Sequence, residues 1–137
     1  MQTIDATDLP AIIHDDNVEL RMGEVGAMTV SFISLKAGTD LGPALVGLAD
    51  DLCPCPHWGY MLEGKLLMRT PSGDHTYEAG QAFYWSPGHA PEALEDCAYV
   101  DSPQLRSSRK FCNTSRALAD DQIGSQVAGS SRARLYV

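Results

Sequence analysis

The stretch HWGYMLEGKLLMR, residues 57–69, decides the fold. Residues 57–62 and 65–69 form two runs of strand length that are rich in aromatic and aliphatic side chains. Glu63-Gly64 lies between them and has the composition of a tight turn. The stretch therefore predicts two short strands joined by a tight turn.

The same pattern of short runs and turn residues extends on both sides of this stretch. Glycine, proline, serine and aspartate separate the runs, for example at residues 71–74, 79–80 and 86–88. The predicted strands cover residues 18–22, 28–35, 57–62, 65–69, 75–78, 82–85, 90–94 and 97–101. Closely spaced strands of this kind predict an all-β protein, an antiparallel sandwich or barrel.

One predicted strand carries an irregular pattern. Residues 28–32 alternate apolar and polar side chains, and the apolar positions then shift by one place over residues 33–35. Because alternate side chains of a strand face opposite sides, this shift predicts a β-bulge.

Length and composition indicate a single soluble domain. The chain has 137 residues and 44% hydrophobic residues, and it contains no apolar run long enough for a membrane span. We expect a strand segment at 1–27, a barrel core at 28–101 and an irregular tail at 102–137. The first eight residues carry acids rather than the basic and apolar regions of a signal peptide, so we expect a cytoplasmic protein with reduced thiols.

Charge is distributed unevenly along the chain. Residues 1–101 hold 16 acids and four bases, a net charge of −12, whereas residues 102–137 hold six bases and two acids, a net charge of +4. An acidic body repels nucleic acid, so we expect no nucleic-acid partner and, without a spanning segment, no membrane partner. The basic tail would bind an anionic partner, pack on the body or stay solvated.

Cys53-Pro54-Cys55-Pro56-His57 places three metal-type ligands at alternate positions. Each proline favours extended backbone in the residue before it, so these ligands should point to one side. Two thiolates and an imidazole suit a transition metal, zinc before iron, although an inert buried cluster gives the same pattern. In a regular strand Cys53 and His57 would start about 13 Å apart. Either the chain bends between them or only two of the three bind one ion.

Two stretches resemble the cupins, small β-barrels of the jelly-roll type. Residues 57–64 resemble the second half of the first cupin motif, with His57 at the place of its glutamate, and the Gly80–His89 stretch, GQAFYWSPGH, resembles the second motif. The ligands depart from the usual cupin pattern. The two motifs of a cupin face each other across the barrel, so the resemblance implies that His89 joins Cys53, Cys55 and His57 as a metal ligand. We expect Cys55, His57 and His89 to form the minimum set, with Cys53 as the fourth ligand. Four protein ligands would make a structural site, and three with a water would make a catalytic one.

The remaining candidates have simpler explanations. We expect Glu63, His14 and His75 to be solvated, and Cys97 to pack in the core. The aromatic residues of the strands would line a pocket, fill the core or form an interface. Three functions stay open: a metal-binding protein with a small ligand in its barrel, a metal-dependent enzyme, or a metal-free sensor or packing module. Exposed sheet edges favour a homodimer, unless the tail covers an edge of its own chain.

Overall fold

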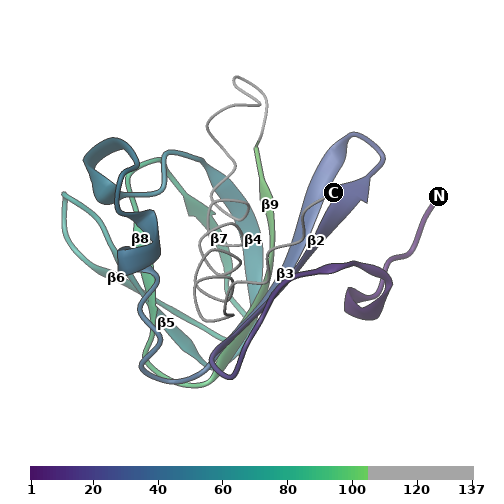
Figure 1. The fold of residues 1–137 in the computed structure, drawn as a ribbon, viewed down its shortest axis with the longest axis horizontal. Coiled ribbons are helices and arrows are strands. Elements are labelled where there is room, and N and C mark those ends of the chain that lie inside the picture. Colours follow the sequence, from purple (N-terminus) through teal and green to yellow (C-terminus); the bar gives the residue numbers. More distant parts are fainter. Residues whose placement is uncertain (105–137) are drawn as a thin grey trace, which may run out of the picture.

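Nine strands and three short 3-10 helices make up residues 1–104, the part of the chain that the computed structural model describes. Figure 1 shows them wrapped into an open barrel, with no α-helix among these residues. The strands are β1 (Ala11–His14), β2 (Val18–Val25), β3 (Met28–Leu35), β4 (His57–Glu63), β5 (Lys65–Arg69), β6 (His75–Glu78), β7 (Ala82–Trp85), β8 (Ala90–Ala93) and β9 (Cys97–Pro103). The 3-10 helices are η1 (Ala6–Asp8), η2 (Gly42–Leu45) and η3 (Ala49–Asp51).

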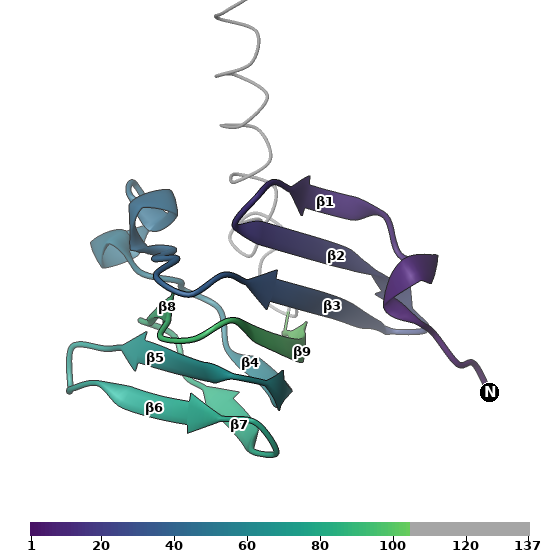
Figure 2. The same cartoon turned by 90° about the horizontal axis from the view of Figure 1, so that it is seen from below.

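The strands form two antiparallel sheets. The larger sheet has the order β1-β2-β3-β9-β4-β7, and the smaller one has the order β6-β5-β8. In Figure 2, β1, β2, β3 and β9 lie next to one another, and β5 and β6 form a separate layer. The all-β, antiparallel fold predicted from the sequence is therefore confirmed.

The tight turn predicted at residues 63–64 connects the two sheets. β4 belongs to the larger sheet and β5 to the smaller one, and Gly64 makes the turn between them. Gly64 has a φ of 69°, in the left-handed region that favours glycine, and a Cβ there would overlap the carbonyl oxygen of Asp96. Glycine at this position lets the chain pass from one sheet to the other.

The core fills the space between the sheets. Its buried side chains come from both, with Met61, Leu66 and Met68 almost completely buried. Phe83 and Trp85 of β7 stack with ring centroids 3.8 Å apart and lie in the same cluster. Burial of side chains at alternate positions explains why the strand pattern is visible in the sequence.

The β-bulge predicted in residues 28–35 is wrong. β3 pairs with β2 and β9 in an unbroken register. Thr29, Ser31, Ile33 and Leu35 all face inward and are buried. The apolar pattern shifts because the first two inward positions carry hydroxyl side chains, and Ser31 lines a cavity that also contains the candidate site.

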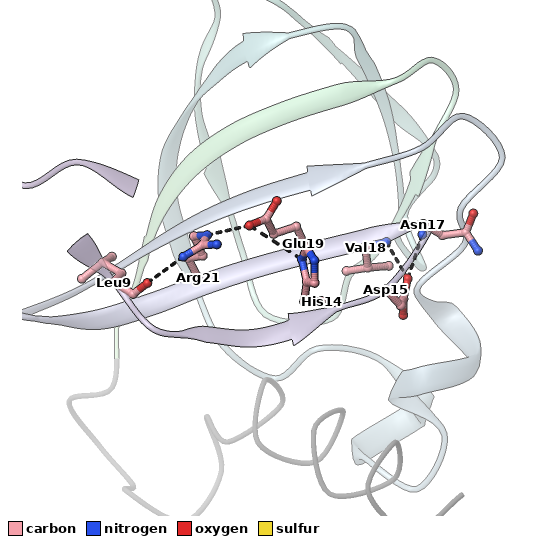
Figure 3. Close-up of polar contacts among 7 residues, drawn as sticks. All are labelled: Leu9, His14, Asp15, Asn17, Val18, Glu19 and Arg21. Atoms are coloured by element: carbon pink, nitrogen blue, oxygen red, sulfur yellow. Dashed lines mark hydrogen bonds and ion pairs between the residues drawn. The ribbon is translucent and has the colours of Figure 1, made fainter. Parts of the chain in front are cut away.

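Polar contacts at the N-terminus fix the hairpin of β1 and β2 (Figure 3). Asp15 Oδ1 accepts hydrogen bonds from the backbone N–H groups of Asn17 and Val18, both at 2.8 Å. Arg21 reaches back to donate to the carbonyl of Leu9 at 3.1 Å and also contacts Glu19 at 2.6 Å. These contacts stabilise the turn and the entry of the chain into β1.

Most predicted strands match the structure within a few residues. β1 was not predicted, because its Ala-Ile-Ile-His run does not alternate apolar and polar side chains. β1 and β2 extend the sheet that contains β3, so the segment 1–27 contributes directly to the barrel wall. Of the tail predicted at residues 102–137, the part from residue 105 onward lies outside the described residues. Within residues 1–104, no helix has the length and apolar character needed to cross a membrane.

Candidate metal centre

Cys53, His57 and His89 place their ligand atoms within 4.8 Å of one another. The Sγ of Cys53 lies 3.5 Å from the Nε2 of His57. Cys53 and His89 are buried, and the side chain of His57 is 17% exposed. The structure thus brings together three of the four residues that the sequence analysis proposed as ligands.

Backbone hydrogen bonds hold Cys53 and His89 side by side. The N–H of Cys53 donates to the carbonyl of His89 at 2.8 Å, and the N–H of Gly88 donates to the carbonyl of Cys53 at 2.7 Å. Gly88 has a φ of 90°, which turns the chain between Pro87 and His89. The Pro-Gly-His turn of the sequence therefore acts by clamping one histidine to the cysteine segment.

His57 reaches the same point from the first position of β4. It pairs with Trp85 of β7 on one side and with Pro103 of β9 on the other. Between Cys53 and His57 the chain bends at Cys55 instead of continuing as a strand. This bend brings Cys53 and His57 together. The sequence analysis had named such a bend as the condition under which both could bind one ion.

Cys55 is not part of the group. It is buried in a small cluster with Leu45, Cys53 and Ala90, and its sulfur is disulfide-bonded. A disulfide sulfur is not a thiolate and makes a poor metal ligand. The expectation of reduced thiols holds for Cys53 and Cys97, which are free, but it is wrong for Cys55.

Each histidine is anchored through its Nδ1 atom. His57 Nδ1 lies 2.6 Å from Asp101 Oδ2, and His89 Nδ1 lies 2.6 Å from the carbonyl oxygen of Ser86. A carbonyl oxygen can only accept, so Nδ1 of His89 carries the proton. Both anchors leave Nε2 as the nitrogen that remains for a metal, in the arrangement by which carboxylates and carbonyls orient metal-binding histidines.

The group fits a transition metal. A thiolate and two imidazoles are zinc-type ligands, and a tetrahedral ion with bonds of 2.0–2.3 Å holds its ligand atoms about 3.5 Å apart. The distance between Cys53 Sγ and His57 Nε2 has this value. With three protein ligands, one position of a tetrahedral ion stays open for a water or a substrate atom.

Without a metal, the same residues polarise one another. Burial alone would raise the pKa of the Cys53 thiol, but hydrogen bonds from His57 and His89 lower it to about 6. Burial opposes protonation of His57, but its hydrogen bonds to Asp101 and Cys53 raise its pKa to about 9. In the metal-free protein a thiolate therefore faces an imidazolium near neutral pH.

Asp101 is the functional residue that the sequence analysis missed. It lies on β9, where Cys97, Tyr99 and Asp101 face inward at alternate positions and are all buried. An aspartate that continues the inward series of a strand must find a partner in the interior, since a buried charge is unfavourable without one. That periodicity is the signal that could have identified it.

The other residues considered from the sequence lie away from this group. His14, His75 and Glu63 are exposed, as expected. Cys97 is buried in the main core cluster, also as expected, and burial raises the pKa of its thiol to about 11. Among the aromatic residues of the strands, Phe83 and Trp85 are buried, whereas Trp58, Tyr60 and Tyr84 are exposed.

Comparison with known proteins supports the fold. No family model matches the chain, and no curated protein matches it in sequence. Among solved structures, a RmlC-like cupin from Shewanella frigidimarina superposes with a TM-score of 0.57 at 12% identity, covering 80% of this chain and 94% of that one. Ectoine synthase from P. lautus superposes with a TM-score of 0.55 at 13% identity, covering 75% of this chain and 77% of that one.

A mutant of oxalate decarboxylase from Bacillus subtilis also superposes, with a TM-score of 0.57 at 17% identity. The match covers 79% of this chain but only 31% of the decarboxylase. These similarities, together with the two facing sheets, show that the protein has the cupin fold. At such low identity they establish the fold and leave the chemistry to be argued from the site.

Proposed function

We propose that this protein binds one transition metal ion, with zinc favoured, through Cys53, His57 and His89, and that a small organic molecule occupies the barrel beside it. The observation that carries the proposal is the convergence of three ligand atoms within 4.8 Å. The two Nδ1 anchors support it, because they present both imidazoles in the orientation that a metal requires. A thiolate ligand favours zinc over iron.

Elemental analysis tests this proposal directly. The full chain would be purified without a metal-affinity tag, and its metal content would be measured by inductively coupled plasma mass spectrometry. We expect close to one equivalent of zinc. Less than about a tenth of an equivalent of any transition metal, in protein exposed to zinc and then desalted, would contradict the proposal.

The open fourth position favours an enzyme over a purely structural site. A metal with a free position lowers the pKa of a bound water or polarises a substrate oxygen. The residues around it would supply the remaining functions: Asp101 holds the orientation of His57, and the apolar wall of the cavity limits the access of bulk water. Hydrolysis of small esters and amides by zinc-loaded and metal-stripped protein would show whether the site turns over.

A second candidate function follows from the order Cys53, His57, Asp101. A thiol next to an imidazole that is oriented by a carboxylate is the arrangement of a cysteine nucleophile. In this alternative the site works without metal. Iodoacetamide labelling separates the two candidates: rapid labelling of Cys53 in protein that takes up no zinc favours the nucleophile, and protection of Cys53 by one equivalent of zinc favours the metal site.

A further inference from the structure

A partly open cavity of about 90 Å³ lies in the barrel beside the metal-type ligands. Its wall consists mainly of apolar side chains, among them Ile13, Leu20 and Ile33, and Cys53, His57 and His89 also line it. On this measure of volume one water molecule needs roughly 10–15 Å³. The cavity therefore has room for a molecule of several non-hydrogen atoms.

Two residues that line the cavity each have a buried polar atom without a hydrogen-bond partner. These atoms are Nε1 of Trp85, a donor, and Oδ1 of Asp101, an acceptor. Trp85 is 3% exposed and Asp101 is 5% exposed. Buried polar groups are nearly always paired, because leaving them unpaired is unfavourable. Two unpaired atoms of opposite type, on residues that line one cavity, indicate a ligand with complementary groups.

The two atoms flank the metal-type ligands. β4 lies between β9 and β7, with Asp101 on β9 and Trp85 on β7. Trp85 pairs with His57 across the β4–β7 ladder, and Asp101 contacts His57 directly through Oδ2. A molecule that satisfies Trp85 and Asp101 would therefore lie next to His57.

The charge of the wall restricts the ligand further. Among the described residues that line the cavity there is no lysine or arginine, and Asp101 is the one carboxylate. Apart from the imidazoles, no described side chain in the cavity wall offers a positive charge to an anionic ligand. With a divalent metal bound, the Cys53 thiolate and the Asp101 carboxylate would balance its charge, so the apolar wall favours a neutral molecule over a charged one.

We propose that the cavity binds a small, neutral, largely apolar molecule whose polar end carries both a hydrogen-bond donor and an acceptor, such as a hydroxyl group. The donor pairs with Oδ1 of Asp101, and the acceptor pairs with Nε1 of Trp85. This inference rests on the proposed function, because it names the class of molecule that lies beside the metal.

Phenol and toluene test the inference as a matched pair, because they differ in a hydroxyl against a methyl group. Isothermal titration calorimetry with the full chain should show that phenol binds more tightly than toluene, by at least roughly three- to tenfold, which is the range of one net hydrogen bond. Equal affinities, or no binding of either compound at millimolar concentration, would overturn the inference.

Trp85→Phe then assigns the donor, since it keeps an aromatic ring but removes Nε1–H. We expect the preference for phenol over toluene to fall by at least about half in this variant. Trp58→Phe is the matched control on the exposed face of β4, and it should keep the preference of the unmodified protein. An unchanged preference in Trp85→Phe would overturn the role of Nε1.

Metal content measured on the same samples separates this inference from the proposed function. Trp85 offers no metal ligand, so Trp85→Phe should retain the metal content of the unmodified protein. Loss of the phenol preference with normal metal content supports the inference. Absence of metal from the unmodified protein contradicts the proposed function and leaves the phenol comparison as an independent test of the cavity.

Discussion

Nδ1 of His57 and Oδ2 of Asp101 lie 2.6 Å apart, and Asp101 is 5% exposed. This contact links the buried carboxylate of β9 to the first residue of β4. It fixes the ring of His57 so that Nε2 faces Cys53. Asp101 is not itself a proposed metal ligand, but it determines the ring orientation of His57, which is one.

Replacing Asp101 by Asn should weaken metal binding without removing a ligand. The amide can present its NH2 group as well as its oxygen to Nδ1, so it no longer enforces one orientation and one tautomer of His57. We expect zinc affinity to fall by roughly 10- to 100-fold, measured by competition with a chromophoric chelator. Asp96→Asn is the control, because Asp96 is exposed and pairs with Lys36 at the surface. Equal affinities of the two variants would show that Asp101 has no positioning role.

Metal affinity should rise with pH across the neutral range. Binding requires a Cys53 thiolate and a neutral Nε2 on His57. The pKa of Cys53 is lowered to about 6 and that of His57 is raised to about 9, so between these values the free protein has the thiolate but must release one proton from His57. Affinity should therefore increase by about tenfold per pH unit from pH 6 to 9 and fall more steeply below pH 6, where Cys53 is also protonated.

Chelator competition at pH 6.5, 7.5 and 8.5 measures this slope. A pH-independent affinity over the range would mean that the metal binds elsewhere or that His57 is already neutral. His57→Ala, assayed in parallel, should bind more weakly because it lacks one ligand. It should still show a slope, because the buried Cys53 thiol loses the hydrogen bond that lowers its pKa and must release its own proton.

Gly64 and Gly26 offer a matched test of the turn between the sheets. Their φ angles are 69° and 62°, so an alanine suffers similar backbone strain at both positions. A Cβ at Gly26 meets nothing within 4 Å, whereas one at Gly64 would overlap Asp96. We expect Gly26→Ala to lower the free energy of unfolding by about 1 kcal/mol and Gly64→Ala by at least about 2 kcal/mol more, in urea titrations. Similar losses would indicate that the backbone at Gly64 moves aside freely.

We also propose that the protein is a homodimer that uses the outer face of β4 and β7. Trp58 and Tyr84 are 54% and 47% exposed, their rings lie 4.7 Å apart, and β7 is an edge strand. An exposed aromatic pair beside an unpaired edge favours association with a second copy. Light scattering should give the mass of a dimer, and Tyr84→Lys should shift it to a monomer, whereas Thr76→Lys on β6 should not. A monomeric unmodified protein at high concentration would contradict this proposal.

The fold could be predicted from the sequence because its strands are short, alternating and separated by glycine and proline turns. The same local signals identified the turns at Gly64 and before His89. The burial of individual side chains is harder to predict, because it depends on how the two sheets come together. The buried hydroxyl of Ser31 and the carboxylate of Asp101 face a cavity that exists only once the sheets are assembled.

The ligand set was predicted only in part, because it too depends on contacts between distant parts of the chain. Spacing alone suggested that Cys53 and Cys55 face the same side and bind the same ion. In the structure the chain bends at Cys55, whose sulfur is disulfide-bonded, and only Cys53 joins the two histidines. The bend depends on the pairing of Cys53 with His89 and of His57 with Trp85, which are contacts between distant parts of the chain. Sequence spacing contains no information about such pairings.

The central claim is that His57 is a metal ligand, and the metal content of His57→Ala tests it most directly. Full-length His57→Ala and its control His75→Ala, which alters an exposed histidine on β6, would be loaded with zinc, desalted and analysed by mass spectrometry. We expect His75→Ala to retain about one equivalent and His57→Ala to lose most of it, with a lower melting temperature because metal bound only to the native state stabilises it. Full zinc content in His57→Ala would contradict the account.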